Sequence, residues 1–242
     1  MWVDPNHKGY VVIVLVAGMY RSGSTFSFNI VKGILESRGK VHQEVGQDIL
    51  AAAASSDKAD HLILKSHVAD EAMFRMVELG AVKAVCTVRK PEDAIASLME
   101  TFDISLHDAT HQTADWIRMF SRFKKHSLVV RYEEIDTQPL KATRKIALYL
   151  YRNAGYFECR RLAAANAKSK VKEKTDSLVP GEAGVVDVKF SYYDSKTLLH
   201  RRHISSLVSR PASERIGSEA VARIRGDLKN YIDREGNLLL ND

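Results

Sequence analysis

The sequence predicts an α/β protein of three layers, in which a central parallel sheet lies between two layers of helices. Two observations support this fold class. Short apolar runs alternate with helical patterns over about residues 10–150, as in chains that form parallel sheets. The runs also lack polar alternation, which is typical of strands buried on both faces. A chain of 242 residues is long enough for one well-buried domain, and we expect residues 1–242 to form one.

The first predicted strand and helix are joined by a glycine-bounded turn. Seven apolar residues at 11–17 predict a buried strand. The turn GMYRSGST follows at 18–25 and leads into a helix with one apolar side, made of Phe26, Ile30, Val31 and Ile34. A strand, a turn and a helix in this order direct backbone N–H groups toward an anion. The turn is therefore P-loop-like, and the hydroxyls of Ser22, Ser24 and Thr25 are candidate phosphate ligands.

The alternation continues to about residue 151. Further strands are predicted at 61–66, 81–88 and 127–132, helices at 48–55, 69–79, from 91 onward, 113–123 and 140–151, and a loop at 40–44. Ligands of such folds bind beyond the carboxyl ends of the strands. Three clusters suited to anions, at 21–25, 65–67 and 89–97, lie at the carboxyl ends of predicted strands. We therefore expect them to meet at one edge of the sheet.

The last third of the chain has a weaker pattern. Lysines alternate with other residues over 168–174, and Pro180, Gly181 and Gly184 follow. We predict a mobile, solvated basic loop there, and a lid over the site at about 168–200 is the alternative. The stretch at about 156–217 is assigned to a variable substrate-binding or lid region, with order returning at 197–205. A final helix is predicted over about 218–234, with an inner face of Val221, Ile224, Leu228 and Tyr231.

The first turn differs from a nucleotide triphosphatase loop at one informative position. Gly18 and Gly23 have the G-x-x-x-x-G spacing of that loop, but Ser24 occupies the place of its phosphate-binding lysine. The cation is instead Arg21, inside the turn. A site for a lone terminal phosphate therefore fits better than a site for a magnesium triphosphate. An ordinary strand–helix turn without a ligand is the alternative.

Composition limits the classes of partner. A formal charge of +6 and a pI near 9.2 suit an anionic ligand. The basic residues are spread along the chain, without the stripe typical of nucleic-acid binders. Cys86 and Cys159 lack the spacing of a metal or redox pair, so we expect a cytoplasmic protein without a metal. No signal peptide is recognised, and the first apolar run is shorter than the ~20 residues that span a bilayer. Stable membrane insertion is therefore not expected.

Three separated motifs extend this interpretation. They are YRSGST at 20–25, LKSH at 64–67 and VRKPEDAIAS at 88–97. In this order, and on these predicted elements, they resemble three motifs of the sulfotransferases that use 3′-phosphoadenosine 5′-phosphosulfate (PAPS). The first is similar to the 5′-phosphosulfate loop in its arginine form, the second to the lysine–threonine–histidine tripeptide of cytosolic members, and the third to the 3′-phosphate signature. The resemblance covers about residues 10–150.

The resemblance implies roles for individual residues. The residues implied to be catalytic are Arg21, Lys65 and His67. The residues implied to bind the donor PAPS and its product 3′-phosphoadenosine 5′-phosphate (PAP) are Arg21, Ser22, Gly23, Ser24, Thr25, Arg89, Ser97, Arg201 and Arg202. The chemistry of Arg89 and Ser97 supports this on its own, because an arginine at a strand end and a serine two helical turns later can face one phosphate. The arginine and the hydroxyls need no metal to hold a phosphosulfate.

Several assignments keep an alternative. His67 is the candidate general base, and its alternative is a histidine that only lines the pocket, with Glu44, Asp103 and His111 in reserve. Arg89 has an ion pair with Asp93 or Glu92 as its alternative. Arg201 and Arg202 belong to LHRRHIS at 199–205, which lacks the tryptophan and glycines of the corresponding segment in cytosolic members. Exposed charges on a turn are the alternative for these two arginines.

The resemblance implies an enzyme that moves the sulfuryl group of PAPS to a hydroxyl of a small-molecule, carbohydrate or lipid acceptor by in-line displacement. Two other functions remain open: a small-molecule kinase or nucleotide hydrolase, and a non-catalytic nucleotide-binding protein. The missing lysine at Ser24 argues against the first. The expected partners are the nucleotide donor and the acceptor, with no nucleic acid, and a homodimer is left open.

Overall fold

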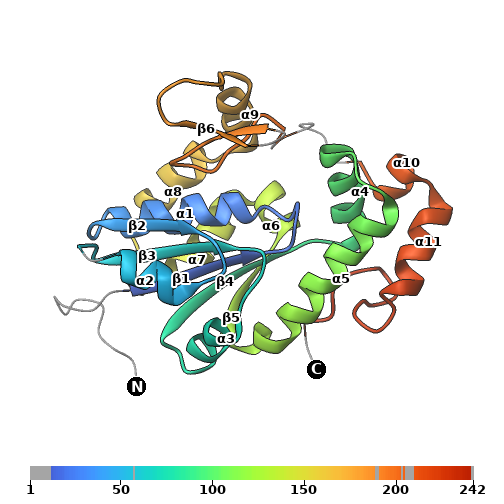
Figure 1. Cartoon of the computed structure of the whole chain (residues 1–242), viewed down its shortest axis with the longest axis horizontal. Helices are drawn as coiled ribbons and strands as arrows, with labels where there is room; N and C mark the ends of the chain where they lie inside the picture. Colours follow the sequence, from blue (N-terminus) through green and yellow to red (C-terminus); the bar gives the residue numbers. More distant parts are fainter. Residues whose placement is uncertain (1–11, 57, 189–190, 203, 205–209, 241–242) are drawn as a thin grey trace.

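A five-stranded parallel sheet forms the middle of the molecule (Figure 1). The computed structural model describes residues 12–56, 58–188, 191–202, 204 and 210–240. The strand order is β2-β3-β1-β4-β5, and every neighbouring pair is parallel. The strands are β1 (Val12–Gly18), β2 (Val41–Val45), β3 (His61–Ser66), β4 (Val82–Val88) and β5 (Ser127–Arg131). Ala17 lies opposite both Ser66 and Cys86, so the carboxyl ends of the three central strands are level.

The four strands that the apolar runs predict are confirmed, with residue 11 outside the described residues. The loop predicted at 40–44 is wrong, because the chain forms the edge strand β2 there. Most of β2 is half-buried and its sequence VHQEV is largely polar. An edge strand pairs on one side only, so β2 depends on its pairing with β3 more than on apolar burial, and it leaves no apolar run to recognise.

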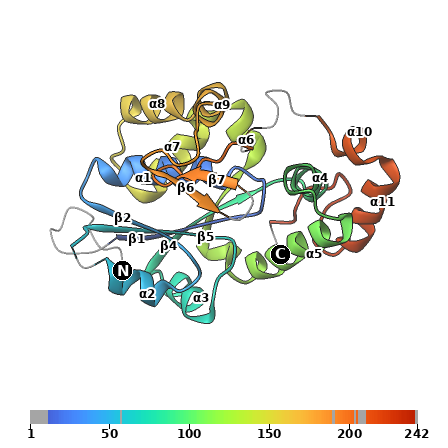
Figure 2. The same ribbon diagram turned by 45° about the horizontal axis from the view of Figure 1, so that its top comes forward.

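Helices cover both faces of the sheet, which confirms the three-layer α/β/α class (Figure 2). One face is covered by α1 (Ser24–Glu36), α7 (Pro139–Leu150) and α8 (Tyr156–Ala165), whose buried side chains join those of β1, β3 and β4 in one core. The second core lies on the opposite face, under α2 (Ile49–Ser55), α3 (Glu71–Glu78), α4 (Pro91–Phe102) and α5 (Leu106–Phe123). Two shorter elements flank β5, namely the 3₁₀ turn η1 (Lys124–His126) and α6 (Tyr132–Thr137).

The C-terminal elements pack beside α4. Helix α10 (Ala212–Ile216) leads into α11 (Ser218–Asp227), and both contact α4. The predicted inner face is partly confirmed, since Ile224 and Leu228 are buried. The predicted end at 234 is wrong, because α11 ends at Asp227. The chain turns back farther on, at Asp233, whose carboxylate accepts hydrogen bonds from the backbone N–H groups of Glu235 and Asn237.

The basic loop predicted around 168–174 is wrong, because these residues form helix α9 (Lys168–Asp176). Val171 and Thr175 lie four residues apart and are both buried, so they form the packed side of the helix. The lysines occupy the outer sides, where Lys172 pairs with Asp176 at 3.0 Å. The helix was not predicted, because its buried side consists of only Val171 and Thr175 and the alternating lysines dominate the local sequence.

A short hairpin follows α9 and leads to a segment that is tied to the core. The hairpin consists of β6 (Val185–Val188) and β7 (Ser191–Asp194). Side chains of α1 and β2 then donate hydrogen bonds to three successive carbonyls: Gln43 to Ser195 (2.6 Å), Lys32 to Lys196 (2.7 Å) and Asn29 to Thr197 (3.0 Å). Of the ordered segment predicted at 197–205, the described part makes one bridge, between Tyr193 and His200. His203 and Ser205 lie outside the described residues.

Candidate functional site

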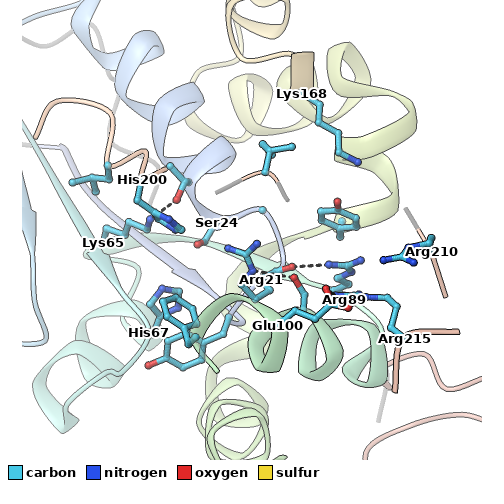
Figure 3. A pocket seen from close by; sticks show the side chains of 18 residues that line it. Arg21, Ser24, Lys65, His67, Arg89, Glu100, Lys168, His200, Arg210 and Arg215 are labelled. Atoms are coloured by element: carbon cyan, nitrogen blue, oxygen red, sulfur yellow. Dashed lines mark hydrogen bonds and ion pairs between the residues drawn. The ribbon is translucent and has the colours of Figure 1, made fainter. Parts of the chain in front are cut away.

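A cavity of about 250 Å³ opens at the carboxyl ends of the strands (Figure 3). Its walls come from the β1–α1 turn, the ends of β3 and β4, helix α4 and several later segments. The described residues that line it include six cations and one carboxylate: Arg21, Lys65, Arg89, Lys168, Arg210, Arg215 and Glu100. This excess of positive charge favours an anionic ligand. The three clusters predicted at 21–25, 65–67 and 89–97 all contribute to this one cavity.

The β1–α1 turn presents backbone donors to the cavity. Gly23 is the residue before α1 and has a left-handed conformation, with φ 87° and ψ 21°. It provides no side-chain cap, and the first N–H groups of any α-helix lack partners within the helix. Ser24 and Thr25 begin α1 and line the cavity. The helix N-terminus, with its positive dipole end, is therefore available to an anion.

Gly18 allows this turn to pack against β4. A Cβ atom at position 18 would overlap with Oγ1 of Thr87 and with the Cβ atom of Ser24. On the other side of the turn, the hydroxyl of Ser22 donates to the carbonyl oxygen of Met19 at 2.6 Å and lies 2.7 Å from Oγ1 of Thr87. The close approach of the turn to Thr87 thus depends on a residue without a side chain at position 18.

We expect the substitution Gly18→Ala to lower the free energy of unfolding by about 2–3 kcal/mol, because the added methyl group overpacks a buried contact. Denaturation in urea measures this loss. Gly46→Ala is the control, since no atom lies within 4 Å of a Cβ atom built there, and a change within about 0.5 kcal/mol is expected. Equal stability of the Gly18→Ala variant and the unchanged protein would contradict the packing role of Gly18.

Arg21, Arg89 and Ser97 meet in the cavity. The Nε atom of Arg21 donates to Oγ of Ser97 at 3.0 Å, and Arg89 donates to the carbonyl oxygen of Arg21 at 3.2 Å. The Arg89 guanidinium also stacks on the ring of Tyr132, 4.1 Å from its centroid. The β1–α1 turn, the end of β4 and the middle of α4 therefore share one site. Arg89 does not pair with Glu92 or Asp93, because Glu92 pairs with Arg225 and Asp93 accepts from the backbone N–H of Ala212.

Burial lowers the pKa of two cations in the cavity, Arg21 and Lys65. Burial, followed by the nearby charge of Arg89, lowers the pKa of Arg21 to about 10. Burial lowers the pKa of Lys65 to about 8. A cation held away from water and next to another cation is unfavourable until an anion joins it. The lowered pKa values therefore support an anion-binding site.

Lys65 of strand β3 brings a cation to the β1–α1 turn. It lies at the end of β3, where it is 8% exposed. Its Nζ atom donates to Oγ1 of Thr25 at 2.6 Å. A cation thus reaches the first turn of α1 although Ser24 occupies the position that a lysine holds in nucleotide triphosphatase loops.

The His67 imidazole has a defined orientation. Its Nδ1 atom lies 2.6 Å from the carbonyl oxygen of Gly18. A carbonyl oxygen only accepts, so Nδ1 carries the proton and Nε2 of the neutral ring is an acceptor. The ring also stacks on Tyr20, with centroids 4.2 Å apart. Burial, followed by the charge of Lys65, lowers the pKa of His67 to about 4, against a smaller opposing effect of Gly18. The imidazole is therefore neutral at pH 7.

Some residues predicted for the site do not line the cavity. The Ser22 hydroxyl points into the protein, toward Met19 and Thr87. Arg201 and Arg202 are exposed, and Arg202 donates to the carbonyl oxygen of Thr101 at 3.2 Å. The backbone of this segment does reach the site, because the carbonyl oxygen of Arg202 accepts from Arg21 at 3.4 Å. Binding roles for these three side chains stay predictions.

The three reserve bases also lie away from the described walls of the cavity. Glu44 is on β2 and lies 3.4 Å from His42. Asp103 ends α4 in a left-handed conformation with φ 54°. His111 is on α5 and lies 3.0 Å from Asp115. Of the candidate bases, His67 is the one that lines the cavity.

The structure adds residues that the sequence patterns did not identify. Among the described lining residues these include His200, Tyr132, Glu100, Lys168, Arg210 and Arg215. Glu100 is held in a fork by Arg215, with contacts of 2.9 and 2.6 Å, and this hydrogen bonding lowers the pKa of the carboxylate. Burial, followed by the charges of Arg21 and Lys65, lowers the pKa of His200 to about 4. Tyr132 is the last residue of the fourth predicted strand, and Lys168 and His200 belong to the segment 168–200, for which a lid is the predicted alternative.

The described residues contain no group of three or more His, Cys, Asp or Glu side chains positioned to hold a metal ion. A function without a metal stays a prediction. None of the helices in the described ranges has the length and apolar character required to cross a bilayer.

Comparison with solved structures identifies the fold. The mouse sulfotransferase SULT7A1 complexed with PAP aligns with a TM-score of 0.63 and 12% identity, over 93% of this chain and 86% of that chain. Retinol dehydratase in complex with retinol and PAP aligns with a TM-score of 0.60 and 14% identity, over 91% of this chain and 81% of that chain. Retinol dehydratase in complex with androsterone and the inactive cofactor PAP aligns with a TM-score of 0.53 and 15% identity, over 95% of this chain and 81% of that chain. No family model and no curated protein sequence matches the chain. The fold of the chain is therefore that of these PAP-bound proteins.

Proposed function

We propose that the chain, which shares its fold with a PAP-bound sulfotransferase, is itself a sulfotransferase that uses PAPS as donor. The acceptor is a hydroxyl of a small molecule, a carbohydrate or a lipid. One observation carries the proposal: the Arg21 turn, the Lys65–His67 pair and the Arg89–Ser97 pair come from three strand ends and line the same cavity. A donor with a 3′-phosphate and a 5′-phosphosulfate on one ribose needs two anion sites of this kind in one cavity.

The first anion site suits a 5′-phosphosulfate. Its donors are the N-terminus of α1 and the hydroxyls of Ser24 and Thr25, with Arg21 beside them. The guanidinium of Arg21 stabilises negative charge that develops on the leaving phosphate. Lys65, whose Nζ atom donates to Oγ1 of Thr25 at 2.6 Å, is proposed to contact the sulfuryl oxygens.

The second anion site suits a 3′-phosphate. Arg89 and Ser97 are 9% and 5% exposed, so a phosphate between them would be largely removed from water. Charge-assisted hydrogen bonds of arginine to phosphate are strong and are often bidentate. Tyr132 holds the Arg89 guanidinium by stacking, 4.1 Å from the ring centroid, and so limits the orientations that Arg89 can adopt.

His67 is proposed as the general base. Its Nε2 atom accepts the proton of the acceptor hydroxyl, while Nδ1–H stays bonded to the carbonyl oxygen of Gly18. In the ligand-free protein, burial and Lys65 lower the pKa of His67 to about 4, and the negative charge of a bound donor raises it toward the range useful for proton transfer. PAPS, when bound, supplies the sulfuryl group, and the residues of the chain position it in line with the acceptor oxygen.

Calorimetric titration distinguishes the proposed function from its alternatives. We expect the chain to bind PAPS and PAP and to bind ATP with magnesium much more weakly, because the lysine of nucleotide triphosphatase loops is replaced by Ser24. Release of PAP from PAPS in the presence of a panel of phenols, sugars and lipid alcohols then tests transfer. Tighter binding of magnesium-ATP than of PAP would favour a kinase or hydrolase. Binding of PAP without transfer to any acceptor class would favour a non-catalytic protein.

The affinity for PAP is expected to depend on pH through Lys65. Below a pH of about 8 the Lys65 ammonium is charged and the affinity is constant. Above that pH the free protein loses this proton and must take it up again on binding, so the dissociation constant rises about tenfold per pH unit. In the Lys65→Arg variant, which keeps its charge, we expect a constant affinity from pH 7 to about 9. Calorimetry across this range checks both curves, and identical curves would contradict the role of Lys65.

A further inference from the structure

The outer surface of α7 and α8 combines exposed apolar side chains with exposed arginines. Phe157 is 80% exposed, Tyr156 50% and Leu148 48%. Soluble proteins seldom gather such side chains without a partner. We define the α7–α8 patch as Arg144, Leu148, Tyr156, Phe157, Arg160 and Arg161, all of which are exposed.

These residues form one continuous surface. The Arg144 guanidinium lies over the ring of Tyr156, 5.7 Å from its centroid, and so connects α7 with α8. The rings of Tyr156 and Phe157 are 5.8 Å apart. Residues four apart lie on the same side of a helix. The remaining members, Leu148, Arg160 and Arg161, each lie four residues after one of the residues just named and are therefore next to it.

The patch is positively charged. Residues 139–165 contain six basic residues and one acidic residue, Glu158. Glu158 pairs with Arg38 of α1 at 2.9 Å, and Lys145 pairs with Glu134 at 3.2 Å. Within the described part of the chain, Arg144, Arg160 and Arg161 take part in no ion pair. Cations and bulky apolar groups thus share one solvent-facing surface.

We propose that the α7–α8 patch docks the protein on the surface of an anionic membrane. Arginines attract negatively charged headgroups, while Phe157, Tyr156 and Leu148 enter the boundary between headgroups and acyl chains. The patch lies on the face of the sheet that α1 also covers (Figure 2). None of its residues is among the described residues that line the cavity, so docking is separate from the proposed catalytic chemistry and does not rest on it.

Charge complementarity favours a membrane over two other partners. A symmetric dimer through this patch would place the same surface of two copies together, so the arginines of one copy would face those of the other. A nucleic acid would satisfy the arginines and stack on the aromatic rings. It offers no apolar environment to Leu148, whereas a lipid surface accommodates all three apolar side chains.

Co-sedimentation of the full chain with lipid vesicles tests the proposal. We expect binding to vesicles of equal parts phosphatidylglycerol and phosphatidylcholine, and at least about tenfold weaker binding to phosphatidylcholine alone. The double variant Arg160→Gln/Arg161→Gln is expected to bind the anionic vesicles about tenfold more weakly. Phe157→Ser is expected to cause a loss of about tenfold or more, because it removes the most exposed aromatic ring.

Two matched controls change other surfaces by the same chemistry. Arg118→Gln/Arg122→Gln removes two arginines, whose side chains are 53% and 48% exposed, from α5 on the opposite face of the sheet. Leu79→Ser removes an apolar side chain that is 81% exposed. Both variants are expected to bind like the unchanged protein, and thermal unfolding checks that all variants fold.

Three kinds of result would overturn the proposal. The first is equal binding to neutral and anionic vesicles, or equal losses in the patch variants and their controls. The second is a dimer in analytical ultracentrifugation that the Phe157→Ser substitution dissociates. The third is binding to a single-stranded RNA probe, lost in the patch variants, without binding to vesicles.

Discussion

The substitution Arg89→Ala is expected to weaken PAP binding by about 10²–10³-fold, because it removes one partner of a buried, charge-assisted contact with the 3′-phosphate. Arg89 is 9% exposed, stacks on Tyr132 and lies beside the hydroxyl of Ser97 in the same cavity. Solvent cannot replace the lost guanidinium at such a position. Titration calorimetry with PAP measures the effect.

Adenosine 5′-monophosphate separates a specific contact from general damage to the site. It lacks the 3′-phosphate, so its affinity is expected to change by less than about fivefold in the Arg89→Ala variant. Lys90→Ala is the matched control, since Lys90 is the next cation along the chain and its Nζ atom donates to the carbonyl oxygen of Glu235 at 3.2 Å. This variant should bind PAP as the unchanged protein does. Equal losses of affinity for both nucleotides, or equal losses in both variants, would contradict the assignment of Arg89 to the 3′-phosphate.

The substitution His67→Ala is expected to lower kcat by about 10²–10⁴-fold, the range of general base catalysis. The dissociation constant of PAP should change little, because the proposed contact of His67 is with the acceptor hydroxyl. The Nδ1 atom of His67 lies 2.6 Å from the carbonyl oxygen of Gly18 and carries the proton, so Nε2 is the acceptor. The rate of PAP formation from PAPS, with the acceptor found in the panel, measures the loss.

Other histidines and carboxylates provide the controls for His67. His111→Ala removes a histidine that lies 3.0 Å from Asp115 on α5, and we expect no change in kcat. Glu44→Gln and Asp103→Asn test the remaining reserve bases with the same expectation. A His67→Ala variant with the full transfer rate would eliminate His67 as the base, while leaving the donor site untouched.

The fold was predictable wherever an element is deeply buried, because buried positions carry recognisable apolar residues. The strands β1, β3 and β4 lie in the centre of the sheet, and each contains three or more consecutive buried apolar residues. The edge strand β2 and the helix α9 were not recognised. The first is mostly half-buried and polar, and the second buries only Val171 and Thr175. In both, tertiary contacts decide the structure more than local pattern.

The site was predictable where a polar cluster directly follows a strand. Arg21, Lys65, His67, Arg89 and Ser97 meet in one cavity because parallel strands end at the same edge of a sheet. Contacts across long stretches of chain left no such signal. The side chain of Lys65 reaches Thr25 forty residues earlier.

The far wall of the cavity is a second example. Lys168, His200, Arg210 and Arg215 approach the site from the last third of the chain, where strand order offers no guide. The orientation of a side chain was equally hidden. Ser22 belongs to the turn, yet its hydroxyl is used to hold the turn against Thr87.

The central claim is that two phosphate sites at neighbouring strand ends hold the 5′-phosphate and the 3′-phosphate of one nucleotide. A crystal structure of the chain with PAP tests this most directly. We expect the 5′-phosphate at the N-terminus of α1 beside Arg21, and the 3′-phosphate between Arg89 and Ser97. A nucleotide bound outside this cavity, or with its 3′-phosphate away from Arg89, would contradict the account.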